Sequence, residues 1–286
     1  MYRLLLSMFA AIAFTASVAA QLPPGMKPFE TTKVADGVYT FRFFFHRNMF
    51  IVTDEGVIVI DPISPQAAKT MRAEIAKITD QPVEYVVYSH EHWDHISGGQ
   101  IFKDEGARFI SHAVCIDEFK RNPSPIVVIP EGTYKKRFDI KLGGRTLELH
   151  HFGRSHGECL TVMRLPKEKI AFIVDIVTPK RIAFRNKPDF YPLDWVRTLR
   201  EIEKRLDFTL IIPGHGPPTA PSSAVSEQRE YLEDLMAAVV AARKSESDPD
   251  KIRKMVKLPL HEKWAGYGSW LEMNVERINS LYHMGK

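Results

Sequence analysis

The sequence is poor in cysteine, contains no long apolar run after its first twenty residues, and shows no internal repeat. Its two cysteines, Cys115 and Cys159, allow at most one disulfide, so the chain is not a small disulfide-stapled scaffold. A chain of 286 residues buries enough apolar surface to fold without such staples. Because spacing along the chain does not show whether two cysteines meet in space, their pairing stays open, and we favour two unpaired, buried thiols.

Charge is nearly balanced and is not clustered along the chain. There are 39 Lys and Arg against 35 Asp and Glu, a formal net charge of +4, and no basic segment that would mark a nucleic-acid surface. A glycine-rich phosphate loop is also missing, because Gly214-His215-Gly216 is too short and contains no lysine. We therefore expect a small-molecule substrate and no nucleic-acid partner, while the oligomeric state stays open.

The first twenty residues have the pattern of a secretory signal peptide. Arg3 supplies a positive start, residues 4–14 are apolar apart from Ser7, and small residues precede Gln21. We expect cleavage after Ala20, which gives a secreted or periplasmic protein without stable membrane insertion. A membrane anchor is the alternative, but the apolar run is shorter than a bilayer-spanning helix needs.

Strand-like and helix-like segments follow one another in the order typical of an α/β protein. Hairpins come first, strands and helices then alternate, and hairpins return before a helical tail, which favours mixed sheets between helices. The predicted strands are 38–45, 49–53, 57–60, 83–88, 108–110, two strands within 134–149, 160–165, 170–174 and 210–212. The predicted helices are 65–78, 96–103, 113–119, one capped by Asp194 and running through 206, 222–244, and 251–284 with breaks at Pro259 and Gly266.

The segment Ser89-His90-Glu91-His92-Trp93-Asp94-His95 carries the chemistry, and it follows directly on an apolar strand. Side chains at alternate positions of an extended segment point the same way, so His90 and His92 can grip one metal ion. Asp94 and His95 lie where the chain turns and can reach a neighbouring ion. Neutral imidazole and carboxylate suit zinc, and also iron or manganese. The alternative is a solvated polar loop. That alternative is disfavoured because so many potential ligands directly follow a buried strand.

This segment resembles the H-x-H-x-D-H signature of the metallo-β-lactamase superfamily. Four further segments resemble that family's pattern in its order, all within residues 38–216. They contain Asp61 after the apolar run 57–60, His156 in Gly153-Arg154-Ser155-His156, Asp175 after Phe172-Ile173-Val174, and His215 in Pro213-Gly214-His215-Gly216.

The resemblance implies an α/β fold, a four-layer αββα sandwich with a two-metal site at one edge. In this family pattern the first ion is held by His90, His92 and His156, the second by Asp94, His95 and His215, and Asp175 bridges them. Asp61 would orient a ligand histidine. The implied organisation is a signal peptide (1–20), an N-terminal arm (21–33), a catalytic domain (34–220) and a C-terminal helical extension (221–286) packed on the same domain.

The resemblance further implies a hydrolase in which two zinc ions, or iron or manganese, activate water to cleave an ester, thioester, lactone or amide bond. Asp94 is the candidate catalytic proton acceptor. A β-lactam hydrolase is a close alternative. It is less expected because His156-Gly157-Glu158-Cys159 departs from the usual His-Thr-x-Gly, and because Asp175 stands where one lactamase subclass has cysteine. An iron-dependent sulfur dioxygenase and a non-catalytic metal-binding protein are the other classes.

Three features outside the motifs have two interpretations each. His46 lies at the tip between the first two strands and is either a substrate contact or part of an aromatic hairpin core. Trp93 either walls the pocket or packs in the core. Residues 177–195 follow the bridging aspartate and are expected to shape the pocket, and Arg181 and Arg185 either bind a carboxylate or are solvated.

Overall fold

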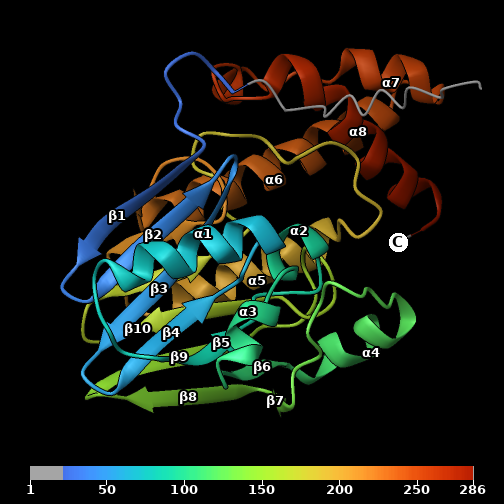
Figure 1. Cartoon of the computed structure of the whole chain (residues 1–286). Coiled ribbons are helices and arrows are strands. Elements are labelled where there is room, and N and C mark those ends of the chain that lie inside the picture. Colours follow the sequence, from blue (N-terminus) through green and yellow to red (C-terminus); the bar gives the residue numbers. More distant parts are fainter. Residues whose placement is uncertain (1–21, 286) are drawn as a thin grey trace, which may run out of the picture.

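The structure, a computed structural model that describes residues 22–285, consists of two β-sheets packed face to face between two layers of helices (Figure 1). The αββα sandwich expected from the sequence is thereby confirmed. The expected signal peptide lies outside the described residues. Within the described range no helix is long and apolar enough to cross a membrane.

The first sheet has seven strands in chain order. They are β1 (Phe29–Ala35), β2 (Val38–Phe43), β3 (His46–Thr53), β4 (Gly56–Ile60), β5 (Val83–Val87), β6 (Arg108–His112) and β7 (Gly132–Tyr134). Pairing is antiparallel from β1 to β4 and parallel from β4 to β7. The sequence did not predict the edge strands β1 and β7. In β1 no residue is fully buried, so it lacks the apolar alternation by which strands are recognised.

Four helices cover the outer face of this sheet: α1 (Pro65–Ala76), α2 (Trp93–Ile96), α3 (Gln100–Asp104) and α4 (Ala113–Arg121). Helix α1 begins at Pro65 because the Ser64 side chain accepts a hydrogen bond from the backbone N–H of Ala67. Met71 and Ile75 of this helix are buried in the same core cluster as strands β4 and β5. Ile78, which the spacing placed in the helix, lies beyond its end and is 37% exposed.

The second sheet has six strands in the order β13-β12-β11-β10-β9-β8. They are β8 (Arg137–Leu142), β9 (Arg145–His151), β10 (Thr161–Leu165), β11 (Ile170–Ile173), β12 (Leu210–Pro213) and β13 (Ala220–Pro221), with only β11 and β12 parallel. Helices α5 (Pro192–Arg205) and α6 (Ser223–Arg243) pack on this side. The expected cap of α5, Asp194, lies instead in its first turn, and Tyr191 occupies the N-cap.

The C-terminal segment forms α7 (Pro249–Met255), a short 3-10 helix (Pro259–His261) and α8 (Tyr267–His283), with breaks where Pro259 and Gly266 predicted them. Apolar residues of α7 and α8 belong to the same core cluster as the second sheet. Helix α8 also fixes the loop after β11, because the Asn274 side chain donates hydrogen bonds to the carbonyls of Ala183 and Arg185. The tail therefore positions part of the pocket described below.

The two cysteines form a disulfide, so the expectation of two unpaired thiols was wrong. Cys115 lies on α4 and Cys159 lies just before β10, and both are fully buried. They are 44 residues apart in the sequence and are brought together only because α4 packs against the segment that precedes β10. No local pattern carries that information.

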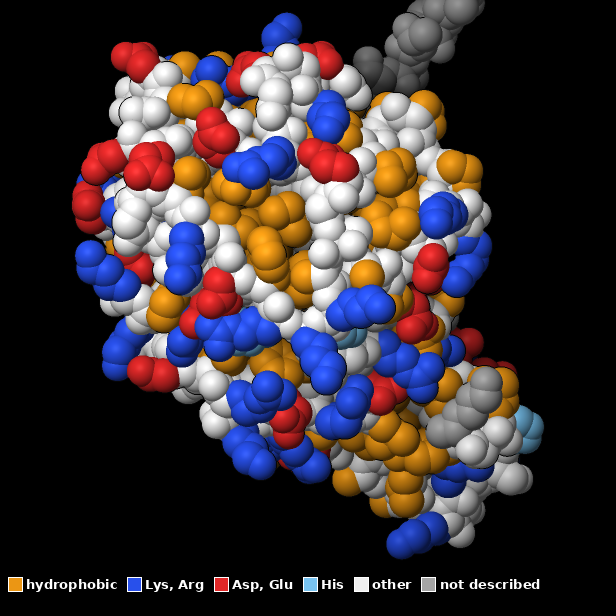
Figure 2. Space-filling model, turned by 90° about the horizontal axis from the view of Figure 1, so that it is seen from below, with side chains coloured by type: hydrophobic (Ala, Val, Ile, Leu, Met, Phe, Trp, Pro, Cys, Tyr) orange, Lys and Arg blue, Asp and Glu red, His pale blue; other side chains and the backbone are white. Residues whose placement is uncertain are grey.

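The tertiary structure also gathers charges that are dispersed along the chain. Figure 2 shows the face seen from below Figure 1, where basic and acidic side chains are mixed but Lys and Arg predominate in the lower half. Several arginines of the second sheet and α5 are ion-paired. Arg137 pairs with Glu148, Arg197 with Asp194 and Arg205 with Glu201.

Candidate metal centre

The histidine-rich segment lies at the end of β5 and runs into α2. His90 follows the strand and is fully buried, whereas His92 is the N-cap of α2. Asp94 lies in the first turn of this helix with half of its side chain exposed, and His95 points back into the protein. The change from extended chain to helix therefore divides the motif into two groups of side chains.

The first group consists of His90, His92, His156 and Asp175, with one potential ligand atom from each within 4.8 Å of the others. Nδ1 of His92 lies 3.1 Å from Nε2 of His156. Oδ2 of Asp175 lies 3.2 Å from Nε2 of His156 and 3.5 Å from Nε2 of His90. The structure thus brings together all residues that the family pattern assigns to the first ion and its bridge.

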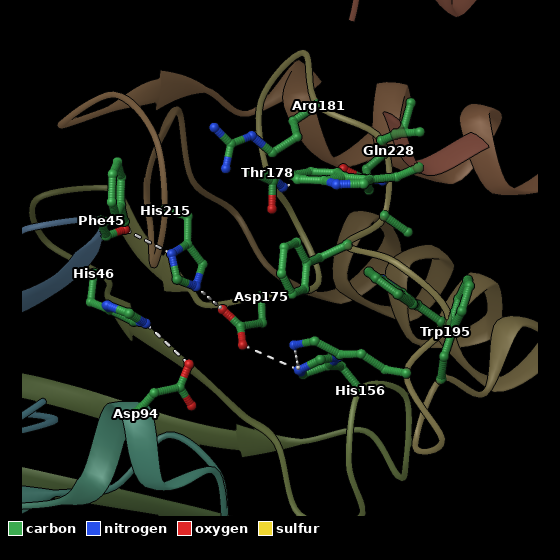
Figure 3. Close-up of a pocket in the computed structure, with 16 residues that line it drawn as sticks. Phe45, His46, Asp94, His156, Asp175, Thr178, Arg181, Trp195, His215 and Gln228 are labelled. Carbon is green, nitrogen blue, oxygen red and sulfur yellow. Dashed lines mark hydrogen bonds and ion pairs between the residues drawn. The ribbon is translucent and has the colours of Figure 1, made fainter. Parts of the chain in front are cut away.

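A second group of histidines, which includes His95 and His215, faces the other oxygen of the Asp175 carboxylate. Oδ1 of Asp175 lies 3.0 Å from Nε2 of His215 (Figure 3). The same oxygen lies 3.4 Å from Nε2 of His95. Asp175 adopts a left-handed backbone conformation, with φ of +57°, two residues beyond the end of β11. This conformation costs a non-glycine residue about 1–2 kcal/mol. Asp175 turns one carboxylate oxygen toward each histidine group.

Asp94 is the residue whose position differs most from the family pattern. Its Oδ2 lies 3.1 Å from Nε2 of His46 (Figure 3). The distance from this oxygen to Nε2 of His95 is 4.0 Å. The close second group consists of His46, His95 and His215, and Asp94 stands at its edge. Of the two roles that the sequence allows for His46, a place beside the metal-site residues at the cavity is the one that the structure supports, and not a place in an aromatic hairpin core.

Outward-facing nitrogens of the histidines are held by hydrogen bonds from the surrounding structure. Nδ1 of His215 donates to the carbonyl of Phe45 at 2.8 Å, and Nδ1 of His90 lies 2.8 Å from Oγ of Ser89. Nε2 of His92 contacts the carboxylate of Asp189. Such outer partners fix the ring orientation and leave the inner nitrogen free to bind a metal. Asp189 was missed because it lies 97 residues from His92 and outside any motif.

Several inward-facing atoms have no hydrogen-bond partner within residues 22–285. They are Nε2 of His90, Nε2 of His95 and Oδ1 of Asp175, all completely buried. Buried polar atoms without partners cost free energy unless something else binds them. These partnerless atoms, and the imidazole and carboxylate groups to which they belong, fit a site for two metal ions.

Comparison with known proteins places the chain in a family. The sequence profile of the metallo-beta-lactamase superfamily matches residues 42–215, which include every residue of both histidine groups. The chain belongs to this superfamily. It is an enzyme family, and the present member has the His- and Asp-rich clusters expected for a dinuclear metal site.

Individual relatives of this metallo-beta-lactamase superfamily member are distant. The 2,4-dinitroanisole O-demethylase subunit alpha of Nocardioides sp. (strain JS1661) is 28% identical over 193 residues, 66% of this chain and 58% of that protein. The linear primary-alkylsulfatase of Pseudomonas sp. (strain ATCC 19151) is 23% identical over 274 residues, 77% of this chain and 51% of that protein. The chain thus spans little more than half the length of these relatives.

A solved structure shows the same fold. The metallo-beta-lactamase from Pontibacter korlensis matches with a TM-score of 0.65 and 21% sequence identity, and the match covers 72% of this chain and 99% of that one. At this identity the likeness shows the fold and not the substrate.

Burial and neighbouring charges move the pKa values of Asp61 and Asp175 away from their usual values. Burial raises the pKa of Asp61 to about 6, although its Oδ1 accepts a hydrogen bond from the backbone N–H of Ser89. Its Oδ2 lies 3.8 Å from Nδ1 of His95, the histidine nearest to it, which is longer than a hydrogen bond. Burial also opposes ionisation of Asp175, but His95 and His215 outweigh it and hold the pKa of that carboxyl well below its usual value.

A cavity of about 520 Å³ opens beside the two groups. Apart from the metal-site residues, its walls are mostly apolar and come from the loop after β11, from α5 and from α8: Ile182, Ala183, Phe184, Phe190, Trp195 and Trp270. Arg181 and Lys187 also line it, and Nζ of Lys187 lies 3.3 Å from Nε2 of His156. Trp93 is 49% exposed and does not line this cavity.

Proposed function

We propose that this protein is a metal-dependent hydrolase that uses two zinc ions to cleave an ester, thioester, lactone or amide bond. The observation that carries the proposal is Asp175, which directs one carboxylate oxygen at each of two histidine groups beside a cavity. When bound, two zinc ions would supply an activated water and electrostatic stabilisation of the oxygen that becomes negatively charged. The imidazole-rich donor set favours zinc, with iron or manganese as alternatives.

The side chains of the first group, together with His95 and His215, would hold the ions, and Asp94 would serve the attacking water. Asp94 lines the cavity, is half exposed, and uses Oδ2 for its contact with His46. Burial works against its charge, but the hydrogen bond from His46 keeps the pKa of Asp94 below its usual value. The carboxylate therefore stays ionised and would accept the proton of the water as it attacks.

The cavity favours a small substrate that has an apolar part and a negative charge. Phe184 and Trp270 form an apolar wall, with ring centroids 4.8 Å apart. Arg181 and Lys187 have no carboxylate partner within the described part of the chain, and each lies over one of these rings. Two cations that form no ion pair with the described residues, at the rim of an apolar cavity, suit an anionic, partly apolar ester.

A β-lactam is the second candidate substrate. It is a cyclic amide with a carboxylate, so it would offer an acyl carbon to the metal site and an anion to Arg181 or Lys187. The same two cations thus support both candidates, and the choice between them rests on turnover.

Metal content and substrate turnover, measured on the same purified protein, test the proposed function. We expect about two zinc ions per chain and hydrolysis of at least one class in a panel of aryl esters, alkyl sulfate esters, thioesters, lactones and β-lactams. Chelator and His92→Ala should abolish turnover, whereas His283→Gln, at the exposed end of α8, should not change it. One iron per chain, with oxygen consumption on a persulfide and no hydrolysis, would instead indicate a sulfur dioxygenase.

We also propose that the mature chain begins at Gln21 in a secreted or periplasmic location. The disulfide between Cys115 and Cys159 supports this, because disulfides persist in oxidising compartments. Mass spectrometry of the protein recovered from the periplasm or medium should give the mass of residues 21–286 with both thiols oxidised. An intact N-terminus with reduced thiols would contradict the proposal.

A further inference from the structure

We propose that His46 is a direct ligand of the second metal ion, which gives that ion three histidines, as the first ion has. The inference rests on the two-metal site of the proposed function. It adds a residue to the set derived from sequence motifs, in which the second ion is held by Asp94, His95 and His215. His46 belongs to none of those motifs, because it precedes them, at the start of β3.

The three imidazoles are close enough to share one ion. One ring nitrogen each of His46, His95 and His215 lies within 4.8 Å of the other two. Zinc–nitrogen bonds of about 2.0–2.1 Å place two ligand atoms of a tetrahedral ion about 3.4 Å apart. Side-chain adjustments of about 1 Å or less therefore suffice to close three nitrogens around one ion.

The first histidine group provides an internal standard for this spacing. Its ring centroids lie 4.5 Å apart for His90 and His92 and 4.7 Å apart for His92 and His156. In the second group, His46 lies 4.9 Å from His215 and 5.4 Å from His95. His95 and His215, which the family pattern does assign to one ion, are also 5.4 Å apart. His46 is thus as well placed as the ligands already assigned.

Hydrogen bonds to the backbone on either side of His46 hold it at this position. On one side of it, the N–H of Arg47 donates to the carbonyl of Gly214 at 2.7 Å. On the other side, the carbonyl of Phe45 accepts from Nδ1 of His215 at 2.8 Å. Arg47 itself is buried and donates to Oγ1 of Thr40. The start of β3, which carries His46, is therefore hydrogen-bonded to the turn that carries His215, and the two rings cannot separate without breaking these bonds.

The role of Asp94 changes as a consequence. Its Oδ2 lies 3.1 Å from Nε2 of His46 and 4.0 Å from Nε2 of His95, and its side chain is 52% exposed against 27% for His46. The ion would then be held by His46, His95, His215 and Oδ1 of Asp175, with Asp94 at its edge. Asp94 would be freer to move a proton than a carboxylate fully committed to the metal.

Metal affinity, measured without any substrate, tests the inference. Chelator-stripped protein is titrated with Zn²⁺ in competition with a chromophoric chelator, and folding of each variant is checked by circular dichroism. We expect the wild type to bind two ions. His46→Gln should weaken the second by at least about 100-fold, beyond the 10–100-fold that losing an outer partner costs. The first ion should be unaffected, and His283→Gln, which removes an exposed histidine, should bind like the wild type.

Two further variants separate a ligand from a residue that only positions Asp94. In an Asp94→Ala background, adding His46→Gln should still weaken the second ion, because a ligand acts independently of its neighbour. His46→Cys should bind Co²⁺ at the second site with a thiolate-to-cobalt charge-transfer absorption, which requires direct sulfur–metal contact.

An unchanged second affinity in His46→Gln overturns the inference. So does an effect that disappears in the Asp94→Ala background, a missing charge-transfer band, or a wild type that binds a single ion. Two bound ions that depend on His46, without turnover of any substrate, would sustain the inference and refute the hydrolase.

Discussion

The disulfide between Cys115 and Cys159 should contribute strongly to stability, and the expected magnitude follows from its position. It joins residues 44 apart, and closing a loop of that length removes unfolded-state entropy worth about 4 kcal/mol at 25 °C. Replacing both cysteines by alanine also removes two fully buried sulfur atoms, which adds roughly 1–2 kcal/mol. We therefore expect the double variant to lose about 5–6 kcal/mol.

The same change should loosen the first metal group. Cys159 follows His156 by three residues, and its Sγ lies 2.9 Å from Oε2 of Glu91, the residue between His90 and His92. Oε1 of Glu91 accepts a hydrogen bond from the backbone N–H of Glu158, so the disulfide, Glu91 and the His156 loop form one packed unit. The first zinc ion should bind more weakly in the double variant, while the second is less affected.

Guanidinium unfolding of metal-free protein, without reductant, measures the stability term apart from metal binding. Thiol counting on denatured wild type should find no free cysteine. A stability loss below about 1 kcal/mol would refute the loop-closure reasoning, and two free thiols in the wild type would refute the bridge itself.

Three more predictions concern single residues. Asp189→Asn should weaken binding of the first zinc ion about 10–100-fold in a chelator competition, because His92 loses a charged partner. Asp194→Asn, which loses only surface ion pairs, is the control. Equal zinc affinities of the two variants would argue against a role of Asp189 in holding His92. Trp270→Ala should lower kcat/KM about 10-fold for esters with large apolar groups but not for acetate esters, since it removes one wall of the cavity; a uniform loss would contradict this. Burial and the stacked His112 lower the pKa of His151 from 6.5 to about 4. Between pH 4 and 6.5 the unfolded state therefore binds more protons than the folded state, and the free energy of unfolding rises with pH across that window. His151→Asn should flatten this rise in urea unfolding by no more than about 3 kcal/mol, and an unchanged slope would refute the assignment.

The sequence by itself determined the two-sheet architecture and the chemistry of the site. Apolar runs of the buried strands, the proline and glycine breaks at Pro259 and Gly266, and the spacing of His90 and His92 are local signals, and each corresponds to an element or side-chain group in the structure. Ligand order along the chain sufficed to place His156, Asp175 and His215 beside the motif, because the family pattern fixes where each strand ends.

Only the tertiary structure decided which residues complete the site. The contacts of His46 with Asp94, of Asp189 with His92 and of Trp270 with the cavity join segments far apart in the sequence. The Cys115–Cys159 bridge escaped prediction for the same reason, whereas the edge strand β1 escaped it because its residues lack apolar alternation. Such pairings depend on how sheets and helices pack, and a local sequence pattern does not show which distant residue will become the contact partner of a given side chain.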